Sequence, residues 1–282
     1  MTEAEGIPKR QLGNTRQQVT VLGLGGEGVL RTWDRDAEAE RLIERALGLG
    51  INYFESARAY AGSESYYGAA LRERRPAIFL TSKTASRSAE GALRDLDATL
   101  KNMRTDYLDL WQLHDLRHAE EWEQAKKPNG VLAALRRAKA DGRVRFIGVT
   151  GHHDPRLLAR ALEEFDFDTV LMPVNVAEVQ YPGFLDVTLP AAIRKGMGII
   201  GMKVLCRGLL VDQDYGLTAT RLIRFALSQP VSLITVGCDN VGQLEENVEA
   251  ARRYSPPDEH ERNELIALTH PYADEAIYYR PL

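Results

Sequence analysis

The feature that most constrains the fold is an unbroken alternation of short apolar runs with amphipathic helical patterns. Between the apolar runs, the segments 37–50, 155–165 and 240–250 each place their apolar residues on one face of a helix. Apolar strands followed by such helices are typical of parallel strands covered by helices. Eight units, spaced about 25 to 37 residues apart, predict an α/β fold, a closed (β/α)8 TIM barrel. The strands are expected near Val21, Asn52, Ala77, Tyr107, Val144, Thr169, Gly198 and Leu233.

The segment before the first strand, "RQLGNTRQQVT", predicts a β-hairpin around Gly13 and Asn14. We expect this N-terminal hairpin to close the bottom of the barrel. No linker or low-complexity tract divides the chain, and 282 residues of which 44% are hydrophobic can bury one large core. We therefore predict that residues 1–282 form a single domain.

The stretch "VTVLGLGGEGVL" contains Gly23, Gly25 and Gly28 in the spacing G-x-G-x-x-G, the fingerprint of a Rossmann dinucleotide site. That site needs a helix to open within the motif, but the helical pattern begins only near Ala37. We interpret the stretch as a glycine loop at the end of the first strand, where Gly25 and Gly26 form a floor for a flat ring. In a barrel, phosphates are instead expected after the seventh and eighth strands.

Charge and cysteine content exclude several classes of protein. The net charge of −4 is spread over interspersed signs, which gives no case for binding nucleic acid. No apolar run approaches the ~20 residues of a membrane span, and we expect no membrane association. The only cysteines, Cys206 and Cys238, fit neither a disulfide scaffold nor a metal site, so we expect a cytoplasmic protein that is a monomer or a weak homo-oligomer. The adjacent His152 and His153 suggest a turn rather than a metal site, and we predict no metal.

Polar side chains stand at or just beyond the ends of three neighbouring strands. Glu55 and Tyr60 follow the second strand, Lys83 ends the third and His114 ends the fourth. Each alone has a structural alternative, namely an ion pair, a loop tyrosine or a core histidine. Because barrel strands meet at one mouth, we expect these four side chains to form a cluster where barrel enzymes carry out chemistry.

The chain resembles the aldo-keto reductases along nearly its whole length. The segments that carry the resemblance are "GINYFESARAYAGSESYYG", "LTSK", "DYLDLWQLH", "RFIGVTGH", "GIIGMKVLCRGLL" and "VGCDNVGQLEENV". The resemblance implies a nicotinamide-dependent oxidoreductase that reduces an aldehyde, ketone or sugar carbonyl to an alcohol, or the reverse. It implies that Tyr60, Lys83, His114 and Glu55 are the catalytic residues, although the family has aspartate where this chain has Glu55.

These residue types suit carbonyl reduction, which needs a hydride at carbon and a proton at oxygen. A lysine about 4 Å away at an effective dielectric near 20 favours a phenolate by about 4 kcal/mol, or about 3 pKa units. We therefore expect Lys83 to bring the pKa of the acid/base Tyr60 close to neutrality. His114 is expected to orient the substrate oxygen, and Glu55 to hold Lys83 in place.

The resemblance also implies an NADPH or NADH site. At the positions that contact the 2′-phosphate, this chain has Gly237 and Gln243 with the acidic Asp239 between them, so we expect a weak preference for NADPH or use of NADH. Arg207 is expected at the pyrophosphate, with a solvated loop arginine as the alternative. The residues expected to bind cofactor are Gly25, Gly26, Thr150, Gly151, Asn175, Met202, Lys203, Leu205, Arg207, Gly208, Leu209, Gly237, Cys238, Asp239, Gln243, Glu246 and Asn247.

Substrate selectivity is expected on the loops around the mouth. Their aromatic residues Trp33, Trp122, Tyr181 and Tyr278 are candidate walls for a small-molecule substrate, and they favour a neutral or weakly polar carbonyl. Two alternative functions remain open. One is a redox-neutral epimerase or lyase that recycles its nicotinamide, and the other is a non-catalytic cofactor-binding subunit. The presence of Tyr60, Lys83 and His114 together argues against the second.

Overall fold

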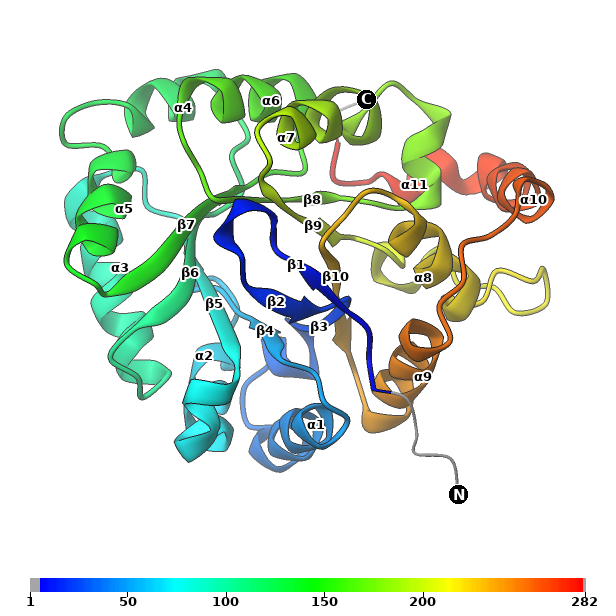
Figure 1. Cartoon of the computed structure of the whole chain (residues 1–282), viewed down its shortest axis with the longest axis horizontal. Helices are drawn as coiled ribbons and strands as arrows, with labels where there is room; N and C mark the ends of the chain where they lie inside the picture. The colour runs from blue at the N-terminus through cyan, green and yellow to red at the C-terminus, as the bar shows by residue number, and fades with distance from the viewer. Residues whose placement is uncertain (1–5, 281–282) are drawn as a thin grey trace.

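The computed structural model describes residues 6–280, and its centre is a closed barrel of eight parallel strands (Figure 1). Around the ring each strand pairs with its neighbours in chain order, and the last strand pairs with the first. This confirms the predicted (β/α)8 barrel. The barrel strands are β3 (Leu22–Gly28), β4 (Tyr53–Glu55), β5 (Phe79–Thr84), β6 (Leu108–Leu113), β7 (Val144–Thr150), β8 (Thr169–Pro173), β9 (Gly198–Met202) and β10 (Leu233–Cys238).

Helices surround the barrel. Two helices begin with a capping side chain: Asp154 accepts hydrogen bonds from the first turn of α6, and Asn240 accepts one from the Gln243 amide of α9. None of the helices within residues 6–280 is both long and apolar enough to cross a membrane. The helices are α1 (Asp36–Gly48), α2 (Ser63–Leu71), α3 (Ala89–Asn102), α4 (Ala119–Ala125), α5 (Val131–Ala140), α6 (Pro155–Glu164), α7 (Leu189–Arg194), α8 (Ala219–Ser228), α9 (Val241–Arg252), α10 (Glu259–Thr269) and α11 (Ala273–Ala276).

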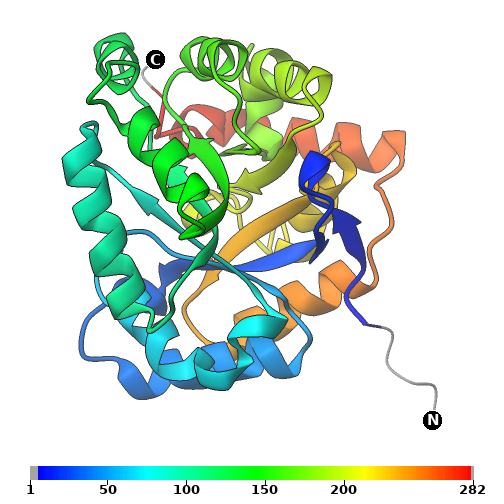
Figure 2. The ribbon, with the colours of Figure 1, turned by 60° about the vertical axis from the view of Figure 1, so that its left-hand side comes forward.

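A hairpin of β1 (Lys9–Gln11) and β2 (Gln18–Thr20) closes one end of the barrel (Figures 1 and 2). In the segment that joins the two strands, the Asn14 amide donates to the carbonyl of Gly196, just before β9. Leu12 is fully buried among the side chains that fill the bottom of the barrel. The hairpin therefore covers the end where the barrel strands begin, as predicted.

The glycine-rich stretch forms β3 and not a Rossmann turn. Gly28 ends the strand with a φ of 68°, and the first α-helix in the described part of the chain begins at Asp36. A Cβ on Gly28 would lie 2.3 Å from the carbonyl oxygen of Cys238, so the close approach of β3 to β10 requires glycine here.

The barrel interior changes from apolar at the bottom to polar toward the mouth. Leu110, Ile200 and Leu233 pack beneath, against the hairpin. Above them lie Thr81 and Gln112, whose buried side-chain polar atoms have no hydrogen-bond partner among the described residues. The polar layer leads directly to the side chains at the mouth.

Candidate active site

Lys83 and Glu55 form a buried ion pair at the mouth of the barrel. Because β4 pairs with β5, Glu55 lies opposite Thr81, one pleat below Lys83 on the same face. The Lys83 Nζ atom lies 2.8 Å from Glu55 Oε1 and donates a second hydrogen bond of 3.0 Å to the Ser56 carbonyl. The exposed fractions are 1% for Lys83 and 4% for Glu55. Glutamate at this position therefore reaches the ammonium.

Tyr60 lies beside this pair, in the turn between β4 and α2. The turn is closed by hydrogen bonds of 2.9 Å from the Tyr60 amide to Ala57 and from the Ser63 amide to Tyr60. The Lys83 Nζ atom is 4.7 Å from the centroid of the Tyr60 ring, and the Arg31 guanidinium carbon is 4.8 Å from it. Two cations thus lie close to the Tyr60 ring.

The protonation of Tyr60 differs from the sequence expectation. Burial raises the pKa of the phenol well above its usual value of 10.0, and the negative charges of Glu55 and Glu27 act in the same direction. We expected Lys83 to bring this pKa close to neutrality, and that expectation is wrong for this structure. The physical reason is that burial penalises the phenolate and the carboxylates of Glu55 and Glu27 disfavour it further, so the pKa rises although Lys83 lies close to the ring. The phenol of Tyr60 is therefore protonated at neutral pH.

His114 completes the group at the end of β6. Its ring meets the Tyr60 ring edge-on, with centroids 5.7 Å apart and planes at 84°. Burial lowers the pKa of His114 well below 6.5, and the charge of Lys83 lowers it further. The imidazole is therefore neutral at pH 7 and has one N–H to donate.

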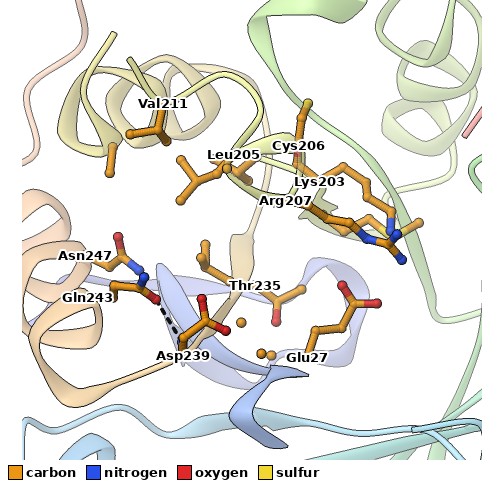
Figure 3. Close-up of a pocket in the computed structure, with 18 of the residues that line it drawn as sticks. Glu27, Lys203, Leu205, Cys206, Arg207, Val211, Thr235, Asp239, Gln243 and Asn247 are labelled. Atoms are coloured by element: carbon orange, nitrogen blue, oxygen red, sulfur yellow. Dashed lines mark hydrogen bonds between the residues drawn. The ribbon is translucent and has the colours of Figure 1, made fainter. Parts of the chain in front are cut away.

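A cavity of about 750 Å³ runs from this group across the ends of β3, β9 and β10 to the start of α9 (Figure 3). Tyr60 and Met202 line one end, and Gln243 and Asn247 line the other. The expected cofactor residues that line this cavity are Gly25, Met202, Lys203, Leu205, Arg207, Gly208, Gly237, Asp239, Gln243, Glu246 and Asn247.

Other expected cofactor residues do not line this cavity. Cys238 is buried, and Asn247 donates to its sulfur. Asn175 is buried and donates to the Tyr279 hydroxyl and the Lys203 carbonyl, so its amide is already engaged. Leu209 is 56% exposed. Thr150 lines the neighbouring cavity instead, and the remaining two residues outside both linings are Gly26 and Gly151.

Two charged residues of this region were missed from the sequence. Glu27 and Arg31 line the cavity and form an ion pair with an Nη1–Oε1 distance of 2.7 Å. Glu27 follows Gly23 and Gly25 at every second residue of β3, so strand periodicity could have placed it facing the barrel axis. No comparable pattern marks Arg31, which lies in a short 3₁₀ turn.

The residues of this cavity fit a dinucleotide. Gly25 and Gly237 present backbone rather than side chains to the cavity, and a Cβ on Gly25 would lie 3.0 Å from the Gly237 amide nitrogen. Arg207 extends into the cavity from the loop after β9 and offers a cation suited to a diphosphate (Figure 3). Asp239 and Gln243 offer polar atoms at the other end, suited to ribose hydroxyl groups. The volume lies within the usual range for small-molecule sites.

A second cavity, of about 610 Å³, adjoins the first at Tyr60 and contains Lys83 and His114 in its wall. Of the four aromatic residues expected to line a substrate site, only Tyr278 does so. Trp122 is an incorrect prediction, because it is fully buried and its indole N–H donates to Glu164 at 2.7 Å. Trp33 is 65% exposed outside both cavities, and Tyr181 donates to Asp274 away from them.

Comparison with known proteins gives a consistent result. Residues 21–218 match the family model described as "Aldo/keto reductase family". The chain is 27% identical to L-galactose dehydrogenase of Arabidopsis thaliana, over 86% of this chain and 88% of that protein. It is 28% identical to pyridoxal 4-dehydrogenase of Microbacterium luteolum, over 72% of each chain. In fold it is similar to an aldo-keto reductase of Bacillus halodurans, with a TM-score of 0.78 at 22% identity, covering 93% of this chain and 96% of that one.

Proposed function

The chain belongs to the aldo/keto reductase family, a family of NAD(P)-dependent oxidoreductases, and from this premise we propose that it reduces an aldehyde, ketone or sugar carbonyl to an alcohol, or catalyses the reverse reaction, with Tyr60 as acid/base. The observation that carries the proposal is the position of Tyr60. Its side chain lines both the elongated cavity that fits a dinucleotide and the second cavity beside it. This position supports Tyr60 as the proton donor to a substrate held where the two cavities meet.

The proton in this reaction comes from Tyr60. When bound in the first cavity, a reduced nicotinamide would supply the hydride for the carbonyl carbon. Tyr60 donates its phenolic proton to the carbonyl oxygen, whose double bond to carbon becomes single. The raised pKa keeps Tyr60 protonated at neutral pH, so every enzyme molecule starts in the donor form. Solvent then returns the proton to the phenolate.

Lys83 stabilises the charge that develops on Tyr60 during this transfer. Its ammonium lies 4.7 Å from the ring centroid and is buried, so the field at the phenol is stronger than it would be in water. Glu55 acts as a positioning residue, because its 2.8 Å ion pair fixes the Lys83 ammonium beneath the ring. His114, neutral and edge-on to Tyr60, donates its N–H to the carbonyl oxygen and orients it.

The cofactor preference follows from the end of the first cavity near α9. The side chains there include the carboxylates of Asp239 and Glu246, and the cations of the lining, Arg31, Lys203 and Arg207, belong to other elements. A 2′-phosphate placed beside carboxylates is repelled, whereas ribose hydroxyl groups can donate to them.

We therefore expect the KM for NADH to be at least tenfold lower than the KM for NADPH. Asp239→Asn removes one of the two carboxylates and is expected to narrow the ratio of the two KM values severalfold. Steady-state kinetics with both cofactors at a saturating aldehyde concentration measures this ratio. A wild-type enzyme that prefers NADPH would contradict the assignment.

Tyr60→Phe tests the acid/base role directly. The variant keeps the aromatic ring and removes the hydroxyl, so we expect kcat for aldehyde reduction to fall by about 10²- to 10⁴-fold, the usual contribution of a general acid. Cofactor binding, followed by quenching of tryptophan fluorescence on titration with NADH, is expected to be unchanged. The activity is read from the absorbance of reduced nicotinamide against a panel of carbonyl compounds.

The matched control is Tyr53→Phe, which also removes one phenolic hydroxyl from the barrel. The Tyr53 hydroxyl has no hydrogen-bond partner among the described residues, so its loss is expected to leave kcat unchanged. Full carbonyl reduction by Tyr60→Phe would refute the proposal. Product formed without net cofactor oxidation would favour a redox-neutral reaction, and cofactor binding without turnover would favour a binding subunit.

A further inference from the structure

We propose that the substrate of this enzyme carries a carboxylate and that Lys203 binds it in the second cavity. The inference rests on the proposed function, because it names the substrate class of the same site. It also replaces the expectation of a neutral or weakly polar carbonyl, which relied on four named aromatic residues, of which only Tyr278 lines this cavity.

The second cavity is lined by more positively than negatively charged side chains. Six lysine and arginine side chains line it, against three carboxylates. Four of the six cations are neutralised by ion pairs, but Lys203 and Arg207 have neither a carboxylate within ion-pair distance nor a side-chain hydrogen bond among residues 6–280. The four pairs are Lys83–Glu55 at 2.8 Å, Arg31–Glu27 at 2.7 Å, Arg87–Glu121 at 3.2 Å and Arg117–Asp115 at 2.6 Å.

Lys203 is held at the junction of the two cavities. It follows Met202 directly at the end of β9, and its Nζ atom lies 5.9 Å from the centroid of the Tyr278 ring. Its backbone has a φ of 59°, the left-handed region that non-glycine residues seldom adopt. Cys206 and Arg207 of the same loop also have positive φ values, of 47° and 58°, so the loop after β9 turns tightly where Lys203 stands.

The charge of Lys203 affects the residues of the second cavity more than the charge of Arg207 does. The charge of Lys203 is one cause of the lowered pKa of His152, after burial and the opposing effect of Asp115. Both His152 and Asp115 line the second cavity and not the first. Arg207 directly precedes Gly208 in the loop after β9 and lines the first cavity, and we assign it to the cofactor diphosphate. One unpaired ammonium then remains for the substrate, which matches the single charge of a carboxylate.

The physical reason for a carboxylate is desolvation. Burial lowers the pKa of Lys203, with Glu27 acting in the opposite direction, so the ammonium is partly stripped of water without an ion-pair partner. A carboxylate in the cavity would supply that partner through a charge-assisted hydrogen bond. Losing such a bond weakens binding by about tenfold to a hundredfold.

Two aldehydes that differ only in charge test the inference. The probes are 4-carboxybenzaldehyde and its methyl ester. We expect the wild-type enzyme to show a kcat/KM at least tenfold higher for the acid. Lys203→Met keeps the length of the side chain and removes its charge, so it is expected to raise the KM for the acid at least tenfold while changing the KM for the ester and for NADH less than twofold.

Lys139→Met is the matched control for loss of one positive charge. Lys139 is paired with Asp168 at the opposite end of the barrel, and the variant is expected to leave the ratio of the two aldehydes unchanged. Equal losses with acid and ester in Lys203→Met, or a raised KM for NADH, would assign Lys203 to the cofactor and overturn the inference. A wild-type preference for the ester would overturn it as well.

Binding of benzoate separates this inference from the proposed function, because benzoate has no reactive carbonyl. Calorimetry in the presence of NADH is expected to show benzoate binding to the wild type and at least tenfold weaker binding to Lys203→Met. If neither aldehyde is reduced but benzoate binding depends on Lys203, the carboxylate site stands and the proposed reaction fails. If benzoate does not bind, or binds both proteins equally, the carboxylate site is wrong whatever the turnover.

Discussion

Burial holds Tyr60 and His114, at the mouth of the barrel, each in one protonation state. It raises the pKa of Tyr60 and lowers that of His114, so the phenol stays protonated and the imidazole stays neutral. Neither state changes between pH 6.5 and 8, so we expect no pH dependence of activity from these two residues there. His152, which lines the second cavity, has a lowered pKa in the folded protein, so it makes the free energy of unfolding depend on pH.

His152 predicts a loss of stability in acid. Burial lowers its pKa to about 4, although Asp115, 3.1 Å from Nε2, acts in the opposite direction. The unfolded chain has a histidine pKa near 6.5, so below that pH it takes up a proton that the folded protein does not. The stabilising contribution is complete above pH 6.5 and is lost as the pH falls toward 4. Between pH 7 and 4.5 this residue is expected to cost about 2 kcal/mol of unfolding free energy.

Urea unfolding at pH 7 and 4.5 checks this expectation. Over this pH interval, the free energy of unfolding of His152→Gln is expected to fall by about 2 kcal/mol less than that of the wild type, because glutamine does not titrate. The exposed His260 provides the control, since His260→Gln is expected to follow the wild type. An unchanged pH dependence in His152→Gln would show that the histidine titrates as it does in the unfolded chain.

Residue identities at the mouth could be predicted from the sequence more readily than their electrostatics. Glu55, Tyr60, Lys83 and His114 stand in recognisable segments at strand ends, and strand order alone places them together. The direction of the Tyr60 pKa could not be predicted, because it depends on burial and on which carboxylates face the phenol. Lys203 was predicted to bind cofactor, and only its contacts show that it faces both cavities.

At the scale of elements, α2 is joined to its neighbours by the buried carboxylate of Glu64. Glu64 is 2% exposed and accepts hydrogen bonds from Ser82 of β5 at 2.8 Å and from Thr99 of α3 at 2.7 Å. It also pairs with Arg58 and accepts from Asn102 at 3.2 Å. The turn that carries Tyr60 lies between Arg58 and α2, so this network holds the turn against the barrel.

Glu64→Ala is expected to lower the free energy of unfolding by about 3–5 kcal/mol, because it leaves a guanidinium and several buried donors without a partner. The control is Glu90→Ala on α3, whose ion pair with Arg94 is 84% exposed on the glutamate side and is worth less than about 1 kcal/mol. Urea denaturation of both variants at pH 7 measures the difference. Similar small losses in the two variants would mean that the network relaxes or takes up water.

The elements themselves could be predicted because each has a local cause. Hydrophobic periodicity located the strands, and the Gly13–Asn14 turn located the hairpin that closes the bottom. The loops could not be predicted in the same way. Trp122 was expected to line a substrate site, but α4 turns it onto α6, where Glu164 accepts its N–H. The fate of a loop aromatic depends on packing between distant segments, for which the sequence has no periodic signal.

In the molecule as a whole, the candidate active site and the hairpin that closes the barrel lie at opposite ends of the barrel. The hairpin buries Leu12 and Val19 among apolar side chains at one end, and the polar side chains and both cavities lie at the other. The seven-residue β3 spans this distance, from Leu22 beside the hairpin to Gly28 at the mouth. The hairpin therefore does not contact Tyr60, Lys83 or His114.

The last described residues lie at the mouth of the barrel, beside the candidate active site. Tyr278 and Tyr279 line the second cavity, and the Tyr279 hydroxyl donates to Glu178 at 2.8 Å. The first described residues lead into the hairpin at the far end. A purification tag or reporter fused ahead of residue 6 will thus emerge remote from the substrate entrance. The same fusion placed after residue 280 would crowd that entrance, so attachment to a sensor surface through the N-terminal side would present the open mouth to solution.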